Sequence, residues 1–121
     1  MNETMKTLLG RRSIRSFRPE PLKKEDLDAI VEVGLYAPSA KNLQSTRLVV
    51  VQDSATIAQL SAVNARIWGN ESADPFYGAP AVIVVLSDSS FPNWIQDGSL
   101  VMGNLMNAAA ALNVGSCWIN R

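Results

Sequence analysis

The chain has 121 residues, of which 47% are hydrophobic and 18% are charged. This composition predicts one folded domain over residues 1–121 and excludes a disordered chain. The 11 lysines and arginines balance the 11 aspartates and glutamates. This balance argues against DNA or another nucleic acid as the main partner, because such binding depends on many phosphate contacts.

The cysteine and histidine contents limit the possible chemistry. Cys117 is the only cysteine, and there is no histidine. An intrachain disulfide, the usual zinc sites and a Ser-His or Cys-His nucleophilic couple are therefore excluded. An enzyme with this composition needs a cofactor to carry its chemistry.

No targeting segment or membrane partner is expected. Residues 1–10 lack the apolar core of a signal peptide. The apolar stretches over residues 79–86 and 100–112 are too short or too interrupted to span a membrane. The default expectation is a cytoplasmic protein.

The first part of the chain is predicted to form two helices and an extended arm. Residues 2–9 form a short helix that ends at Gly10, and residues 11–18 form the arm. A second helix covers residues 23–36, and residues 37–42 form a loop because they are small or polar and include a proline. The buried stripe of the second helix consists of Leu27, Ile30, Val31 and Gly34.

The second part alternates strands and helices. Residues 47–52 and 79–87 are predicted buried strands, the first buried on both faces, and residues 114–120 are a third strand. Asp53 caps a helix that runs to Trp68. A long helix over residues 92–112 is apolar around most of its circumference, which predicts a covering helix from a partner subunit. The order of elements predicts an α/β or α+β sandwich, and no Gly-x-Gly-x-x-Gly motif supports a Rossmann fold.

A cluster of arginines lies in the extended arm. Arg11, Arg12, Arg15 and Arg18 fall within eight residues of the sequence. In an extended chain, Arg11, Ser13 and Arg15 project to the same side. Guanidinium groups with a hydroxyl between them suit a phosphate monoester. The alternative is a solvated basic strip at the edge of the domain.

Two further features suit a flat ligand. Asn64 lies on an otherwise apolar helix face, where its amide needs both donor and acceptor partners. The uracil-like edge of a flavin or a nucleobase offers such a pair, and a bond to nearby backbone is the alternative. In the loop over residues 38–44, small residues permit close approach, and Asn42 and Gln44 are placed to bond a ligand's rim. The alternative for this loop is an ordinary helix-to-strand connection.

Four segments together resemble the nitroreductase family. The string Arg-Arg-Ser-Ile-Arg-Ser-Phe at 11–17 is similar to the family's N-terminal signature, and residues 37–44 are similar to its Ala-Pro-Ser-x-x-Asn-x-Gln loop. Residues 76–85 resemble its Ala-Pro strand, and Gly-Ser-Cys-Trp-Ile at 115–119 resembles the strand after its long helix. The resemblance covers essentially the whole chain in the family's order.

The resemblance implies a homodimer with a nitroreductase-like α+β fold. This fold is a three-layer α/β/α sandwich with a central mixed sheet, in which the long helix lies at the dimer interface. Each flavin mononucleotide (FMN) lies between the subunits. The implied contacts to the FMN phosphate, ribityl chain and pyrimidine edge come from Arg11, Arg12, Ser13, Arg15 and Asn64. The loop of the other subunit that lies against the ring corresponds to Pro38, Ser39 and Ala40. The backbone near Asn120 and Arg121 is implied to approach the flavin N5.

The implied activity is hydride transfer in a ping-pong reaction. NADH or NADPH reduces FMN and departs, and an acceptor such as a nitroaromatic or a quinone takes its place. No protein side chain is needed as a catalytic acid or base, in agreement with the missing histidine.

The sequence departs from the family's pattern in two places. The family's loop continues to Gln-Pro-Trp, whereas residues 44–47 here are Gln-Ser-Thr-Arg, which removes bulk near the active-site mouth. The family also continues beyond its Trp-Ile strand, so the chain is expected to lack the usual C-terminal portion. Two alternatives therefore stay open: a flavin- or ligand-binding protein without turnover, and a dimeric structural remnant without flavin.

Overall fold

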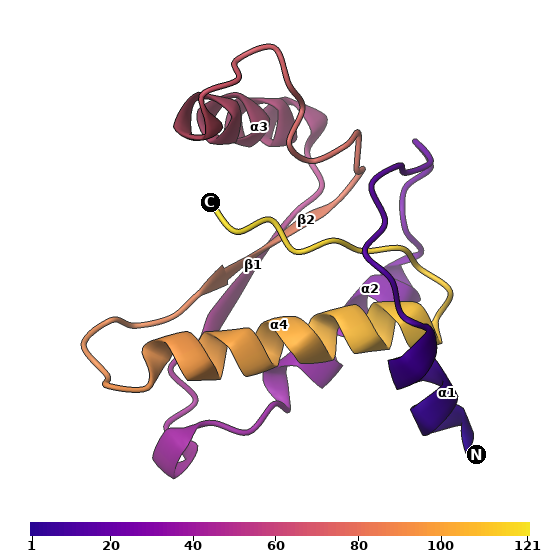
Figure 1. The fold of residues 1–121 in the computed structure, drawn as a ribbon, viewed down its shortest axis with the longest axis vertical. Helices are drawn as coiled ribbons and strands as arrows, with labels where there is room; N and C mark the ends of the chain where they lie inside the picture. The colour runs from indigo at the N-terminus through magenta and orange to yellow at the C-terminus, as the bar shows by residue number, and fades with distance from the viewer.

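A computed structural model describes residues 1–121. It consists of helices around a small antiparallel sheet (Figure 1), which confirms the predicted α+β class. The elements in chain order are α1 (Glu3–Gly10), α2 (Lys24–Leu35), the 3-10 turn η1 (Ala40–Asn42), β1 (Arg47–Val51), α3 (Ser54–Trp68), β2 (Val82–Leu86) and α4 (Trp94–Ala111).

The helix ends follow local capping chemistry. The Asn2 side chain caps α1 by accepting a hydrogen bond from the backbone N–H of Met5 at 3.0 Å. Asp53 caps α3 as predicted, accepting from the Thr56 N–H at 2.9 Å. The helix ends at Gly69, whose φ of 85° is readily accessible only to glycine. These caps explain why the predicted limits of α1 and α3 agree closely with the structure.

The hydrophobic core lies between α2 and α4. The predicted stripe on α2 is confirmed for Leu27, Ile30 and Gly34, which are buried, whereas Val31 is only partly buried. A Cβ atom at Gly34 would collide with the Leu105 side chain, so this glycine lets the two helices approach closely. The buried core cluster consists of Ile30, Ala37, Val101, Leu105, Ala108 and Ala109.

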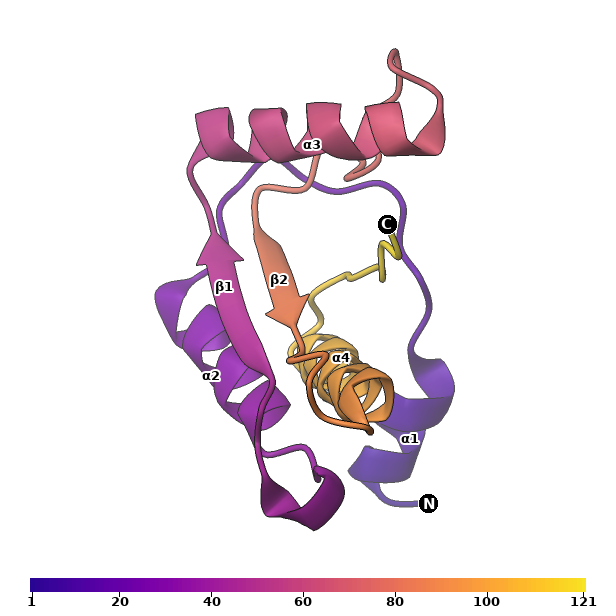
Figure 2. The same cartoon turned by 90° about the vertical axis from the view of Figure 1, so that its left-hand side faces the viewer.

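The sheet has two antiparallel strands, with Arg47 opposite Leu86 and Val51 opposite Val82. The prediction that β1 is buried on both faces is wrong, because Val49 and Val50 are 45% and 39% exposed. Figure 2 shows the reason: α3 lies across the ends of the strands and does not cover the sheet face. β2 is likewise only partly buried, with Ile83 and Val85 packed against the core.

The predicted third strand over residues 114–120 is also wrong. This segment is extended but forms only one parallel bridge, between Ser116 and Ser13. The Ile14 N–H donates to the Ser116 carbonyl at 2.9 Å. A strand needs a ladder of such bonds, and β2 pairs only with β1. The two-stranded sheet is purely antiparallel, and this parallel bridge lies outside it.

Much apolar surface is left uncovered. The accessible surface is 8175 Å² for a mass of 13.1 kDa, whereas a compact monomer of this mass has about 6,400 Å². On α4, Val101 and Leu105 are buried, but Ile95 and Leu100 are exposed. α4 thus carries apolar side chains outside its buried stripe, and a covering helix from a partner subunit stays a prediction. None of the helices combines the length and the apolar character needed to cross a membrane.

Candidate cofactor site

The arm over residues 11–18 runs beside the C-terminal segment over residues 114–121, and the bridge between Ser13 and Ser116 joins them. Gly115 permits this approach, because a Cβ atom there would lie 3.2 Å from the Ile14 side chain. Figure 1 shows the C-terminal segment continuing from the arm across the sheet toward α3. The arm, the C-terminal segment and α3 thus border one side of the molecule.

Arg11 supplies an unused hydrogen-bond donor. Its side chain lines a cavity of about 460 Å³ between α1, the arm and the end of α4. Its Nη1 atom is buried and has no hydrogen-bond partner. Lys6, which is paired with Glu3, and Arg12 add two more cations to the lining, which contains no acidic residue. A cavity with this lining favours an anion.

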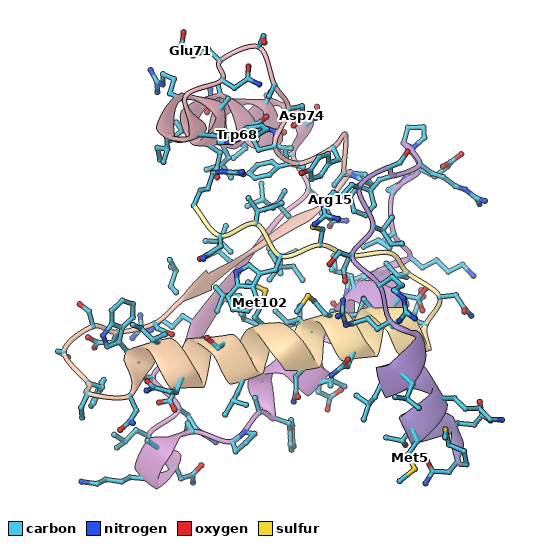
Figure 3. The ribbon with its side chains drawn as sticks, viewed as in Figure 1. Met5, Arg15, Trp68, Glu71, Asp74 and Met102 are labelled. Carbon is cyan, nitrogen blue, oxygen red and sulfur yellow. The ribbon has the colours of Figure 1, made fainter.

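The other predicted residues of the arm differ in orientation. The Arg12 guanidinium turns back on α1, where its Nη1 atom donates to the carbonyls of Leu9 and Arg11, both at 2.8 Å. Arg15 is exposed, and Figure 3 shows its side chain projecting from the arm on the side of the C-terminal segment. Ser13 is exposed as well. Arg11, Ser13 and Arg15 are therefore better placed to meet a ligand than Arg12 is.

Asn64 supplies an unused acceptor on α3. Its Nδ2 atom donates to the Leu60 carbonyl at 3.3 Å, whereas its Oδ1 atom is buried without a partner. Trp68 lies one helical turn further along, and the guanidinium carbon of Arg121 is 4.4 Å from the centre of its ring. This stacking brings the predicted residues Asn120 and Arg121 beside the helix that carries Asn64.

The predicted loop lies elsewhere in the same chain. The Ala40 N–H donates to the Asp97 carboxylate, near the start of α4, whereas the cavity around Arg11 is lined by Ala110, near its end. The rise of an α-helix places these two points about 20 Å apart. One protomer therefore does not bring Pro38, Ser39, Ala40 and Asn42 together with the arm.

Two acidic residues that sequence reasoning did not single out organise this architecture. Asp97 is buried within α4, and a charge inside a mostly apolar helix was the available signal. Asp74 accepts hydrogen bonds from the Ser61 hydroxyl and from the backbone N–H groups of Phe76 and Gly78. Burial acts to raise the pKa of Asp74, but these three bonds together lower it below 3.8. These hydrogen bonds of Asp74 connect α3 to the turn before β2.

Comparisons with known proteins agree on one family. Residues 8–121 match the sequence model of the Nitroreductase family. A crystal structure of a nitroreductase with bound FMN from Bacteroides fragilis has a TM-score of 0.93 at 28% identity, covering 99% of this chain and 71% of that chain. An FMN-bound nitroreductase from Desulfitobacterium hafniense has a TM-score of 0.83 at 30% identity, covering 93% of this chain and 66% of that chain.

Sequence relatives also match nearly the whole chain. One is a protein of Archaeoglobus fulgidus that carries the provisional name NADH dehydrogenase/NAD(P)H nitroreductase, and it is 34% identical over 124 residues. The match covers 98% of this chain and 68% of that relative. In a relative from Methanothermobacter thermautotrophicus, at 28% identity, the match covers 96% of this chain and 60% of the relative's length. The predicted nitroreductase-type fold is thus confirmed, and the chain belongs to the nitroreductase family.

Proposed function

We propose that the chain binds FMN and acts as an NAD(P)H-dependent oxidoreductase. The names of its relatives support this activity: a 61-residue match, covering half of this chain and 24% of the relative, is 43% identical to an FMN reductase [NAD(P)H] of Bacillus subtilis. The structures from Bacteroides fragilis and Desulfitobacterium hafniense contain FMN. We also propose a cytoplasmic location, because nicotinamide nucleotides are abundant there.

The observation that carries the proposal is a complementary pair of unused polar atoms. The unpaired Nη1 group of Arg11 suits the phosphate of FMN, since guanidinium and phosphate form strong charge-assisted bonds. The free carbonyl of Asn64 suits the N–H of the flavin's pyrimidine ring. Buried polar atoms without partners are rare in folded proteins, so a ligand that pairs both atoms fits the chain.

The chain's residues would then bind and orient the cofactor. Arg11, Ser13 and Arg15 lie along an extended arm of about 13 Å, which suits the phosphate and the ribityl chain. Asn64 would fix the rotation of the ring, and the backbone at Asn120 would lie near the reactive edge. Bound FMN supplies hydride transfer between NAD(P)H and an acceptor such as a nitroaromatic or a quinone. This chemistry needs no histidine.

We also propose that two chains complete each site as a homodimer. The uncovered surface supports this, because Tyr36, directly after α2, is 81% exposed and Leu100 on α4 is 48% exposed. The position of the loop over residues 38–44 supports it as well. This loop and the arm lie at opposite ends of α4, and a twofold axis can bring the loop of one protomer to the arm of the other.

The test is the visible absorbance spectrum of the purified protein before and after anaerobic addition of NADH or NADPH. We expect flavin bands that bleach on addition of the reduced nucleotide. Bands that do not bleach would indicate a flavin-binding protein without turnover. A protein that stays colourless after incubation with excess FMN would contradict the proposal.

A further inference from the structure

One buried charge has no role in the contacts proposed above. Asp97 is 4% exposed and is the only buried charged side chain. Neither ion pair of the chain includes it. Burying a carboxylate that lacks hydrogen-bond partners costs free energy. An apolar side chain of similar size avoids this cost. Packing therefore does not explain why an aspartate stands at this position.

The partner of Asp97 is the loop over residues 38–44. Its Oδ1 atom accepts from the Ala40 backbone N–H at 2.9 Å. Asp97 lies in the first turn of α4, where the helix dipole favours a negative charge. The other hydrogen bonds of this loop stay within it. Asp97 therefore provides the only hydrogen bond between the loop and another part of the chain.

The loop has a backbone that needs such an anchor. Lys41, Asn42 and Gln44 have φ angles of 53°, 54° and 53°, a region that residues with a Cβ atom rarely occupy. The Gln44 N–H donates to the Ser39 hydroxyl oxygen at 3.0 Å, which closes the loop on itself. Strained backbone persists only where surrounding contacts hold it in place. The bond to Asp97 is the contact that fixes this loop relative to α4.

We infer that Asp97 is a positioning residue for the cofactor site. It holds Ser39 and Ala40 in the conformation in which they lie against the flavin bound by the other protomer. Asp97 does not touch the cofactor and acts only through Ala40. This inference rests on the proposed function, because it assigns the loop to a flavin site that two chains share.

The first experiment compares two substitutions of Asp97 by titrating FMN fluorescence. Asp97→Asn keeps the oxygen that accepts from Ala40, whereas Asp97→Leu removes it with little change in size. We expect Asp97→Leu to raise the Kd for FMN by about tenfold or more, as for the loss of a hydrogen bond to a charged group. Asp97→Asn is expected to stay within about threefold of the unsubstituted protein. The control Ser99→Ala removes a bond within α4 to the Ile95 carbonyl and should leave Kd unchanged.

A second variant removes the same hydrogen bond from the loop side. Ala40→Pro deletes the N–H donor, and proline is well tolerated at the first position of a helical turn such as η1. Ser39 already has the extended conformation that a following proline requires, with φ −135° and ψ 155°. We expect Ala40→Pro to weaken FMN binding as Asp97→Leu does. If Asp97→Leu fails to fold, Asp97→Asn and Ala40→Pro decide the matter.

Two outcomes would overturn the inference. Folded Asp97→Leu and Ala40→Pro proteins that bind FMN with unchanged Kd would show that the anchor has no effect on the site. If the unsubstituted protein binds no FMN, the proposed function fails separately, and amide hydrogen exchange then tests the anchor alone. Exchange at Ala40 that is about tenfold faster in Asp97→Leu than in Asp97→Asn would support the anchor. Equal exchange rates would overturn it.

Discussion

The α2–α4 pair and the α3 side of the molecule are built on different principles. Between α2 and α4, apolar side chains such as Ile30 and Leu105 are buried, and the one buried charge has a partner. On α3, Ala65 alone is fully buried, and the Asn64 carbonyl is buried without a partner. The first region is stabilised by its own packing. The second leaves the Asn64 carbonyl unpaired, which suits the proposed role of this side in binding a ligand.

The largest difference between the two regions should appear when a leucine is truncated in each. Leu105→Ala opens a cavity in the buried core and is expected to lower the free energy of unfolding by about 2–5 kcal/mol. Leu60→Ala on the half-buried face of α3 should lower it by about 1–2 kcal/mol, because less apolar surface is lost. Urea denaturation followed by circular dichroism, without FMN, measures both. Equal losses would show that α3 is packed as firmly as the core.

The arginines of the arm should affect binding much more than folding. Replacing Arg11 and Arg15 together with alanine is expected to weaken FMN binding by about 2–4 kcal/mol, since each provides charged hydrogen bonds that add incompletely. The control replaces Arg47 and Arg66, two exposed cations elsewhere, and should leave Kd unchanged. Isothermal titration calorimetry with FMN measures both pairs. An unchanged Kd in the Arg11 and Arg15 variant would rule out the phosphate role.

Two asparagines allow the same substitution in each region. Asn64→Leu should weaken FMN binding by about 1–2 kcal/mol, because the acceptor for the flavin's N–H is lost. The unfolding free energy without FMN should not fall, because a buried carbonyl without a partner is removed as well. Asn104 on α4 donates to the Val33 carbonyl of α2 at 3.0 Å, so Asn104→Leu should lower stability by about 1 kcal/mol and leave Kd unchanged. If the two variants behave alike in both measurements, the assignment of Asn64 to the cofactor is wrong.

Elements with local signals were predictable from the sequence. Asp53 marks the start of α3, and the stripe around Ile30 marks the buried side of α2. The segment over residues 114–120 was wrongly predicted as a strand because its apolar character suits one. Whether such a segment pairs depends on neighbours that are distant in the sequence. Here only Ser116 finds a partner, in the arm at Ser13.

The candidate site was predictable only in part, for the same reason. Arg11 and Asn64 could be proposed from the sequence because a cluster of cations and an amide on an apolar face are local patterns. Asp97 was missed because its partner Ala40 lies 57 positions away in the sequence. The orientation of Arg12 was missed too, since its bonds to Leu9 and Arg11 depend on how α1 ends. Residue types indicated a phosphate and a flavin, but the anchoring contacts required the fold.

The smallest expected effect concerns Asp74, whose hydrogen bonds hold the turn before β2 against α3, where few side chains are buried. Asp74→Asn should lower the free energy of unfolding by about 1 kcal/mol at pH 7, because one amide cannot accept all three hydrogen bonds and solvent screens the carboxylate.

The pKa of Asp74 is lowered below 3.8 in the folded protein by the bonds from Ser61, Phe76 and Gly78, against the opposing effect of burial. The stability that the ionised carboxylate contributes is therefore fully present well above pH 3.8. It is lost as the pH falls through the lowered pKa. The stability difference between the two proteins should accordingly shrink when urea denaturation is repeated near pH 3. Asp53 and Asp88 also have lowered pKa values, but they titrate in both proteins and cancel in the difference. A difference that stays constant between pH 7 and pH 3 would show that shape, and not charge, is what Asp74 contributes.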